Sequence, residues 1–276
     1  MKLESSRQID AQGAARHIGQ WMSQYLEASG LDGWVVGVSG GIDSAVTSTL
    51  AALTGKPTTL LRMPIHQAVD QDQRGADHIA WLESTHAHVS SCVVDLTSSF
   101  DGLSEALAAS DDGPFGGLSL ANARARLRMT TLYAVAAERR ALVAGTGNKV
   151  EDFGVGFYTK YGDGGVDLSP IADLLKSEVY ALGTVLNVGE AILNAAPTDG
   201  LWGDDRTDED QLGATYDELE WAMERMAEGR GSADFEGGTR HRAVMDIFTR
   251  HHTMNRHKMD PIPVCKLPEH LFQQRR

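Results

Sequence analysis

Four short runs of apolar, β-favouring residues alternate with longer helical patterns in the first half of the chain, and this alternation constrains the fold more than any other feature. A strand that is apolar on both faces needs a cover on each side, and parallel sheets obtain it from the helices that connect their strands. We therefore expect a doubly wound α/β fold with a parallel sheet covered by helices. The predicted strands are 34–38, 58–63, 90–95 and 141–146, and the helices lie near 43–53, 71–87, 98–109 and 118–139.

The chain of 276 residues is long enough for one large core, and no stretch of it marks a convincing domain boundary. We expect a single domain with three parts: an N-terminal helix within 1–30, an α/β core at 31–183, and a helical and loop part at 184–276. The glycine-rich segment 147–170 is too long for a mere connector, and its aromatic residues argue against disorder. It is therefore a predicted functional loop.

The second half predicts shorter helices separated by loops. Thr215, with Glu218 three residues on, has the pattern of a capping box for a helix that begins at Tyr216. The prolines after residue 260 oppose regular structure in the tail. The other segments are helices at 173–183, 189–196 and about 240–254, a loop rich in turn formers and acids at 197–211, and a mobile connector at 228–238.

Charge and composition exclude several classes of protein. The formal net charge of −13 argues against a general nucleic-acid surface, which needs clustered Lys and Arg to neutralise phosphates. No apolar run approaches the length of a membrane span, and the N-terminus lacks the apolar core of a signal peptide. Two cysteines, Cys92 and Cys265, form neither a disulfide framework nor a metal-ligand spacing. We expect a cytoplasmic protein that binds neither nucleic acid nor membrane.

The stretch VVGVSGGIDSAV carries the clearest chemical signal, because a buried strand there runs directly into a helix. Free backbone N–H groups and the positive end of the helix dipole make such a junction an anion site. Gly40 and Gly41 allow close approach of the main chain, and Ser39 and Ser44 add hydroxyl donors. Asp43 would repel an anion unless a cation lies between them, so the stretch predicts Mg²⁺ bridging Asp43 to phosphate oxygens. The alternative is an ordinary helix cap formed by the aspartate or Ser44.

SGGIDS resembles the pyrophosphate loop of the ATP pyrophosphatases, which cleave ATP between its α and β phosphates and activate an oxygen as its adenylate. Other motifs occur in the order seen in one branch of that group, the ammonia-dependent NAD synthetases, and the resemblance spans roughly residues 15 to 265. These motifs are ANARARLRM (121–129), GTGNKVE (145–151), YTKYGDGGVD (158–167), Lys176, the PTDGLW loop (197–202) and RHK (256–258).

The resemblance implies an enzyme that converts deamido-NAD, ATP and ammonia into NAD, AMP and pyrophosphate through an NAD-adenylate intermediate, in the last step of NAD biosynthesis. It also implies a C–N bond-forming ligase that needs Mg²⁺ and acts as a homodimer. Glutamine-dependent relatives carry an additional amidase domain, which residues 1–30 cannot hold. Ammonia, free or delivered by a separate protein, is the expected nitrogen donor.

The resemblance also assigns roles to single residues. Asp43, Lys176 and Asp167 are the expected catalytic residues, and Asp167 is the candidate that helps to deliver free ammonia from ammonium. Asp43 and Glu151 are the expected magnesium ligands. The implied ATP contacts are Ser39, Gly40, Gly41, Asp43, Ser44, Thr146, Lys176 and Thr198, and the implied deamido-NAD contacts are Arg126, Lys160, Asp167, His257 and Lys258.

Without the resemblance, simpler interpretations stay open for several of these residues. Arg126 and Glu151 could be solvated surface groups, and Thr146 could cap a turn. Lys160 and Asp167 could form a surface ion pair, which contributes only about 0–1 kcal/mol. Arg128 lies two residues from Arg126 on the same predicted helix, so the two should point in different directions.

Two features of the sequence depart from the family pattern, and two rival functions can be compared with it. Lys160 lies nine positions after Glu151, one more than we expect in some relatives. The segment 62–81 matches the family's mobile loop only loosely. A tRNA-modifying ATP pyrophosphatase would need a basic face and usually functional cysteines, and a silent nucleotide-binding regulator would not need the intact SGGIDS, Glu151 and Lys176.

The tail concentrates positive charge in an otherwise acidic chain, and His251-His252 alone is a poor metal site because no third ligand stands at a usable spacing. The basic residues are Arg240, His241, Arg242, Arg250, His251, His252, Arg256, His257 and Lys258.

Overall fold

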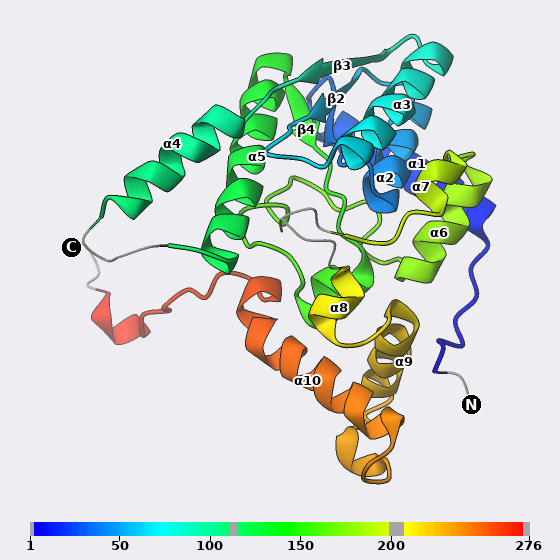
Figure 1. Cartoon of the computed structure of the whole chain (residues 1–276), viewed down its shortest axis with the longest axis vertical. Coiled ribbons are helices and arrows are strands. Elements are labelled where there is room, and N and C mark those ends of the chain that lie inside the picture. The colour runs from blue at the N-terminus through cyan, green and yellow to red at the C-terminus, as the bar shows by residue number, and fades with distance from the viewer. Residues whose placement is uncertain (1–2, 111–114, 199–206, 273–276) are drawn as a thin grey trace.

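A parallel sheet forms the centre of the chain (Figure 1), whose computed structural model describes residues 3–110, 115–198 and 207–272. The four strands lie in the order β3-β2-β1-β4, and every neighbouring pair is parallel. This confirms the predicted fold class and the position of each predicted strand. The strands are β1 (Gly33–Gly37), β2 (Thr58–Arg62), β3 (Val89–Val93) and β4 (Ala141–Val143).

Helices cover both faces of the sheet because successive side chains of each strand point to opposite sides. Trp34 and Val36 of β1 belong to one apolar cluster, whereas Val35 between them belongs to another on the opposite face. The first cluster includes side chains of α1 (Ala11–Ser29), α2 (Ile42–Leu53), α3 (Val69–Thr85) and α6 (Lys176–Val185). The second includes side chains of α4 (Thr97–Ala108) and α5 (Leu118–Arg139).

The strand order reverses direction beside β1, and this reversal places the site. The chain moves outward from β1 through β2 to β3 and then returns to pair β4 with the other edge of β1. Right-handed connections put α2 and α3 on one face and α4 and α5 on the other, as a reversal of direction requires. Open α/β sheets bind ligands at such a switch point, beyond the carboxyl ends of the two strands. Here those ends lead into residues 39–44 and 144–151.

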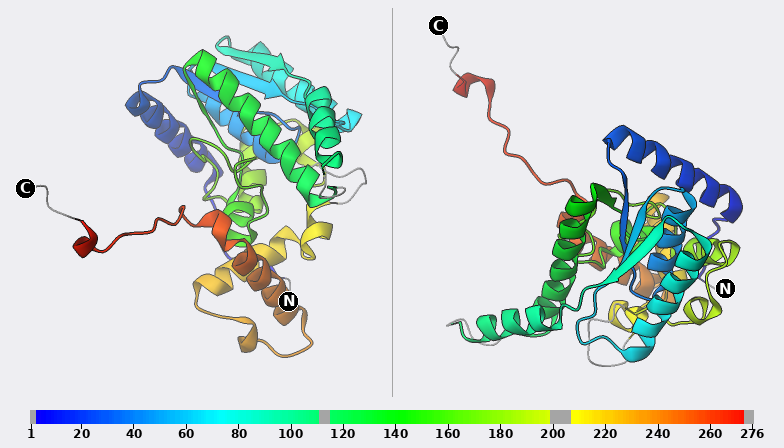
Figure 2. Two further views of the ribbon diagram at one scale, coloured as in Figure 1. Left: turned by 90° about the vertical axis from the view of Figure 1, so that its left-hand side faces the viewer. Right: turned by 90° about the horizontal axis from the view of Figure 1, so that it is seen from above.

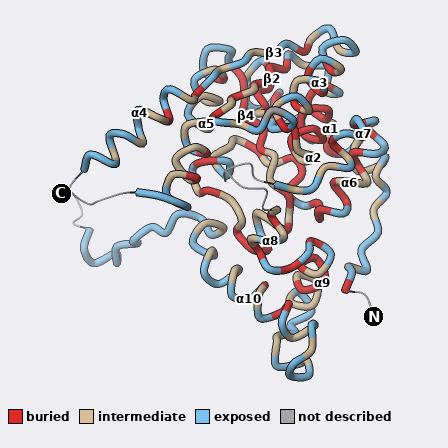
Figure 3. The backbone as a smooth tube through the Cα atoms, viewed as in Figure 1, coloured by how far each residue is buried: buried red, intermediate tan, exposed pale blue. Residues whose placement is uncertain are grey.

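A separate apolar cluster lies beyond the sheet, where α9 (Tyr216–Ala227) and α10 (Arg240–Met259) pack against residues of the 147–170 segment (Figures 1 and 3). Phe248 of α10 is almost completely buried in it. Thr215 caps α9 with Glu218 in the predicted capping box. The cluster therefore holds the glycine-rich segment in place from the side opposite the sheet.

Several predicted boundaries were wrong. The 147–170 segment contains one turn of π-helix, η1 (Val150–Val155), which sequence patterns cannot distinguish from α-helix. Within 197–211 the structure has a short helix, α8 (Asp208–Leu212), and 199–206 lie outside the described residues. α10 continues to Met259 instead of ending near residue 254. The remaining short elements are α7 (Glu190–Leu193), η2 (Ser232–Asp234) and η3 (Glu269–Leu271).

The C-terminal segment after Asp260 extends away from the body as an arm (Figure 2). Its described residues are exposed, and they include several large apolar side chains. Over the described part of the chain, we find no helix of the length and apolarity that crossing a membrane requires.

Candidate active site

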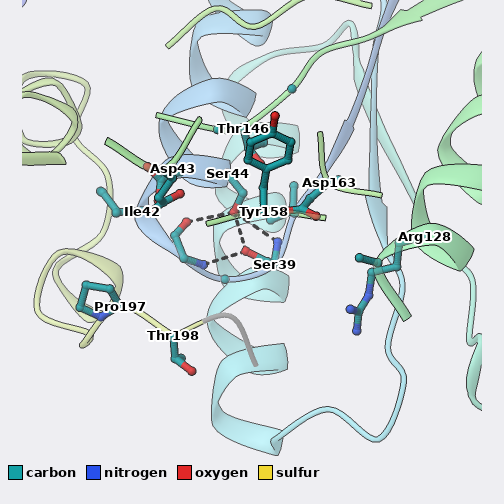
Figure 4. A pocket seen from close by; sticks show the side chains of 18 of the residues that line it. Ser39, Ile42, Asp43, Ser44, Arg128, Thr146, Tyr158, Asp163, Pro197 and Thr198 are labelled. Carbon is teal, nitrogen blue, oxygen red and sulfur yellow. Dashed lines mark hydrogen bonds between the residues drawn. The ribbon is translucent and has the colours of Figure 1, made fainter. Parts of the chain in front are cut away.

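The Ser39–Ser44 loop follows β1 and is closed by hydrogen bonds within itself (Figure 4). The Ser39 backbone N–H donates to Ser44 Oγ at 3.2 Å, and Ser44 Oγ donates to the Gly41 carbonyl at 2.9 Å. Gly40 has φ of 86°, and a Cβ there would lie 2.3 Å from the Gln71 carbonyl oxygen of α3. Only glycine fits this position, and no side chain caps the first backbone N–H groups of α2, which follow the tight turn.

Asp43 does not cap α2, so the capping alternative fails for this residue. The N-cap is Gly41, and no side chain caps the helix. The Asp43 carboxylate instead accepts hydrogen bonds from Lys176 Nζ at 2.6 Å and from Asn148 Nδ2 at 3.0 Å. The first turn of α2 thus aims an acid across the cavity toward the segment after β4.

Lys176 lies between two carboxylates at the start of α6. Its Nζ is 2.6 Å from Asp43 Oδ2 and 3.0 Å from Glu151 Oε1, and only 4% of its side chain is exposed. Burial alone would lower the pKa of Lys176, but the adjacent carboxylates of Asp43 and Glu151 raise it above its ordinary value. The lysine therefore stays charged and holds together two acids that come from opposite sides of the switch point.

Tyr216 at the start of α9 completes this group. Its hydroxyl donates to Glu151 Oε1 at 2.6 Å, and the Lys176 ammonium lies 4.8 Å from the centre of its ring. Burial raises the pKa of Tyr216 far above its ordinary value, and the nearby charge of Glu151 raises it further. The hydroxyl therefore keeps its proton. Glu151 is consequently a structured group with two donors and not a solvated loop residue.

The donor set suits magnesium in its chemistry. Asp43 and Glu151 present carboxylate oxygens to one point, which the Lys176 ammonium shares. Mg²⁺ is commonly held in proteins by one or two carboxylates together with phosphate oxygens and water. Among the described residues no group of three His, Cys, Asp or Glu side chains forms a complete metal site. The two expected ligands therefore fit an ion that arrives with a phosphate-bearing ligand.

Asn148 is a member of the site that the sequence analysis missed. It is fully buried, and its Oδ1 accepts hydrogen bonds from the backbone N–H groups of Val150 and Glu151, both at 3.1 Å. Its amide donates to Asp43. One side chain thus caps η1 and orients the loop acid. An asparagine placed three residues before Glu151 is a recognisable capping signal, but its partner Asp43 is 105 residues away.

One cavity joins the loop to the 144–166 segment, α5 and the start of α8. Thr146 and Thr198, both predicted to contact ATP, line it. Arg128 lines it as well and donates to the Met63 carbonyl at 3.0 Å, whereas Arg126 is exposed, donates to the Lys160 carbonyl and is not part of the lining. The two arginines point in different directions, as predicted. Figure 4 shows Arg128 and Thr198 on separate walls around the loop.

Acidic groups crowd the far wall of the cavity. Burial raises the pKa of Asp152 to about 8, and the charge of Glu151 adds to this effect. Asp163 accepts a hydrogen bond from the Thr159 backbone N–H at 2.8 Å. Part of the residue is exposed to solvent. Burial of the carboxyl group itself, and to a smaller extent the charge of Glu151, raises the pKa of Asp163 to about 6. Neither residue was in the predicted site, and both line the cavity.

Asp167 has a different environment from Asp163. Its carboxylate accepts hydrogen bonds from the Val143 backbone N–H at 2.8 Å and from the Tyr133 hydroxyl at 3.0 Å. It is absent from the described cavity lining, and Lys160, its predicted ion-pair partner, donates to the His257 carbonyl. In this chain Asp167 fastens the segment beside β4, so its predicted contact with deamido-NAD stays a prediction.

The predicted pair His257-Lys258 lies at the end of α10 and touches the 156–160 segment of the same chain. Lys258 Nζ donates to the Gly156 and Tyr158 carbonyl oxygens, both at 2.8 Å. Lys160 Nζ donates to the His257 carbonyl at 2.5 Å. The structure therefore brings Lys160, His257 and Lys258 together outside the described lining of the cavity.

The chain is similar to known proteins over most of its length. The sequence profile of the NAD synthase family matches residues 14–261. The chain is 36% identical over 239 residues to the NH3-dependent NAD(+) synthetase of Carboxydothermus hydrogenoformans, an alignment that covers 86% of this chain and 90% of the relative. It is 38% identical over 205 residues to that of Mesoplasma florum, covering 74% and 81%.

Among solved structures, an NMN synthetase from Francisella tularensis superposes with a TM-score of 0.79 at 30% identity, covering 95% of this chain and 100% of the other. The match to the family spans the loop after β1, the segment after β4 and the helix that carries Lys176. The chain therefore belongs to the NAD synthase family, as the order of its motifs predicted.

Proposed function

We propose that this chain amidates the nicotinate carboxylate of deamido-NAD with ammonia and uses ATP to activate that carboxylate as its adenylate. The observation that carries the proposal is the group formed by Asp43, Lys176 and Glu151 at the open end of the Ser39–Ser44 loop. A loop suited to bind anions, next to two carboxylates and a buried lysine, is suited to bind a polyphosphate together with its metal cation. A dehydrogenase or a simple hydrolase would need none of this arrangement.

The ATP phosphates would lie against the uncapped backbone N–H groups at the start of α2, at the end of the Ser39–Ser44 loop. Asp43 and Glu151 would hold Mg²⁺, which when bound neutralises charge on the phosphate oxygens. Lys176 adds a fixed positive charge that needs no rearrangement during the reaction. Thr146 and Thr198 line the same cavity and are the proposed further contacts to ATP, with Gly40 and Gly41 allowing the close approach.

The chemistry needs no nucleophile from the protein. The carboxylate of deamido-NAD attacks the α-phosphorus, the bond to the β-phosphate oxygen breaks, and pyrophosphate leaves. Ammonia then attacks the activated carbonyl carbon, and AMP leaves with the electrons of the C–O bond. Positioning and charge neutralisation by Asp43, Lys176 and the loop supply the acceleration.

Ammonium must lose a proton before it can attack, and Asp163 suits this step better than the predicted Asp167. Asp163 lines the cavity, and its pKa of about 6 lets it accept a proton near neutral pH. The carboxylate of Asp167 already accepts two hydrogen bonds within the protein. We propose that Asp167, with Arg126, Lys160, His257 and Lys258, contributes to the deamido-NAD site by shaping the 156–167 segment or by direct contact.

We also propose a homodimer, for which the arm after Asp260 gives support. A segment with many exposed apolar side chains is a candidate for burial against a partner, and a second copy is the partner that the family resemblance implies. A variant that ends at Asp260 should be smaller than a dimer by light scattering. A dimer of unchanged strength in that variant would remove the arm from the interface. The exposed apolar residues of the arm are Ile262, Val264, Leu267, Leu271 and Phe272.

The test of the proposed function is an assay of the purified protein with deamido-NAD, ATP, MgCl2 and NH4Cl, in which NAD, AMP and pyrophosphate are measured together. We expect the three products in equal amounts, their loss in Asp43→Asn, and no turnover when glutamine replaces ammonium. ATP that stays intact, or that is cleaved while deamido-NAD persists, would contradict the proposal.

A second arm of the assay replaces deamido-NAD with nicotinate mononucleotide, because one structural relative is an NMN synthetase. Both substrates carry the same nicotinate carboxylate, so the chemistry on the loop side of the cavity is identical. We expect a higher kcat/KM with deamido-NAD. The reverse preference would keep the reaction class and change the substrate.

A further inference from the structure

The segment that carries Glu151 is wound differently from an ordinary helix. In η1 the backbone N–H of Gly156 donates to the Glu151 carbonyl five residues earlier, and Phe157 N–H donates to the same oxygen at 2.9 Å. A π-turn accommodates one residue more than an α-turn.

Three side chains of α10 bind the carbonyl oxygens at the end of this turn. His252 Nδ1 lies 2.7 Å from the Gly154 oxygen, and Asn255 Nδ2 donates to the Val155 oxygen at 2.8 Å. Lys258 then donates to the Gly156 oxygen. The three donors are spaced three residues apart on one face of α10, and they meet three consecutive carbonyls.

The contact between the two elements is close. A Cβ at Gly156 would lie 2.3 Å from Asn255 Cβ, and one at Gly154 would lie 3.3 Å from Phe248 Cε2. Gly154, Val155 and Gly156 are all buried, so their carbonyls need partners from the protein. Helix ends leave such carbonyls open, and here α10 supplies the donors.

We propose that His252 and Asn255 are positioning residues for Glu151: they hold η1 in its π form and thereby keep the Glu151 carboxylate at Lys176 and Asp43. If the turn paired again as a regular α-helix, residues on its two sides would shift by one position, roughly 100° around the axis. Glu151 could not then keep its place between Lys176 and Tyr216. The claim that α10 holds η1 rests on the geometry alone. The claim that this places Glu151 for catalysis also rests on the proposed function.

The first test is amide hydrogen exchange on the full-length protein without ligands. In Asn255→Ala, which keeps Cβ and removes the donor, we expect exchange at Gly156 and Phe157 to become at least about tenfold faster, as loss of one buried hydrogen bond allows. Thr253→Ala is the matched control, because this exposed residue is on the same helix and points away from η1. Equal exchange in the two variants would overturn the proposal.

The second test uses the assay of the proposed function with varied Mg²⁺. In Asn255→Ala we expect the Mg²⁺ concentration for half-maximal rate to rise about tenfold and kcat to fall about tenfold, with KM for deamido-NAD unchanged. A purely structural defect would lower the amount of active enzyme and leave the Mg²⁺ requirement as in Thr253→Ala. That result would overturn the catalytic part.

A third pair of variants covers the case in which Asn255→Ala does not fold. The amide nitrogen of asparagine can take the place of histidine Nδ1, whereas that of glutamine takes the place of Nε2. His252→Asn should therefore keep the protection of Gly156 and the Mg²⁺ requirement, and His252→Gln should lose both. The same behaviour in the two would overturn the proposal. If the wild type makes no NAD, the proposed function fails, while the exchange comparison still decides whether α10 holds η1.

Discussion

Two segments meet at the site, and they are held in opposite ways. The Ser39–Ser44 loop is closed by hydrogen bonds between residues at most five positions apart. In the other segment, the carbonyl oxygens of residues 154, 155, 156 and 158 bind donors on α10 that are 98 to 102 residues away. The first is a local structure that presents backbone N–H groups, and the second is a long-range structure that presents a carboxylate.

This difference predicts which substitutions affect ligand binding alone and which also affect stability. A local loop keeps its form as long as the strand and helix beside it are intact, so changes there should affect ligand binding first. A segment that depends on distant donors loses its form together with the packing of α10, so changes there should lower stability and activity together. Lys176 and Asn148 are the residues that connect the two segments through Asp43.

Lys176→Met should have the largest effect, because it removes the charge that both segments share. Two buried carboxylates then face each other without a cation, which costs about 3–5 kcal/mol, and kcat should fall on the order of 10³-fold. Urea denaturation with and without Mg²⁺, together with the NAD assay, measures both effects. Mg²⁺ should restore part of the stability and little of the rate.

Lys149→Met is the control for this prediction. Lys149 pairs with Asp173, whose side chain is 85% exposed, so its loss should cost no more than about 1 kcal/mol. A Lys176→Met enzyme within tenfold of the wild-type rate would show that the two carboxylates do not depend on the lysine.

Asn148→Ala should come next, since it breaks the second link. It removes the cap of η1 and the donor to Asp43, and leaving these buried groups without partners costs about 1–3 kcal/mol. We expect kcat to fall on the order of 10²-fold. Asn148→Asp keeps an oxygen for the cap but places a negative charge at Asp43, so it should retain more order in η1 than Asn148→Ala. Hydrogen exchange at Val150 and Glu151 reports this order, and equal protection in the two variants would show that the cap is unimportant.

A pair of glycine substitutions compares the two segments directly. Gly156 has φ of 63°, and an added Cβ would clash with Asn255, so Gly156→Ala should lose about 2–4 kcal/mol of stability. At Gly41 an added Cβ meets only Ser39 Oγ, at 3.5 Å, and stability should change by less than about 0.5 kcal/mol. Gly41→Ala should instead raise KM for ATP, by about tenfold, because the Cβ occupies the side from which phosphate approaches. Thermal melts and ATP titrations separate the two outcomes, and a destabilised Gly41→Ala with normal KM would reverse the comparison.

What the sequence could predict follows the same division. The alternation of strands and helices and the SGGIDS loop are local patterns, so the fold class and an anion loop that contains Asp43 could be predicted from them. Lys176 was predicted only through the family resemblance, and its contact with Asp43 was not predicted. The π-turn could not be predicted, since sequence patterns do not distinguish it from a turn of α-helix. Asn148, Tyr216 and Asp163 were missed because their roles depend on residues far away in the chain or on which side of a loop faces the cavity.

The last expected effect concerns the support beneath the local loop, and it appears only on acidification. His78 of α3 is buried and lies 3.0 Å, through Nε2, from Ser48 Oγ of α2, the helix that begins at the loop. Burial lowers the pKa of His78 to about 4. The unfolded chain, with a histidine pKa of about 6.5, binds more protons between these values, so stability is complete above pH 6.5 and is lost as the pH falls toward 4.

This loss amounts to at most about 3 kcal/mol in the wild type. His78→Gln has no titrating group at this position, and it should be less stable than the wild type at neutral pH. The difference in unfolding free energy between the two proteins should shrink by about 2 kcal/mol at pH 5. Urea denaturation of both at pH 7 and pH 5 measures this difference. An equal difference in unfolding free energy at the two pH values would mean that His78 accepts its proton in the folded protein. The buried contact between His78 and Ser48 would then tolerate a charged histidine.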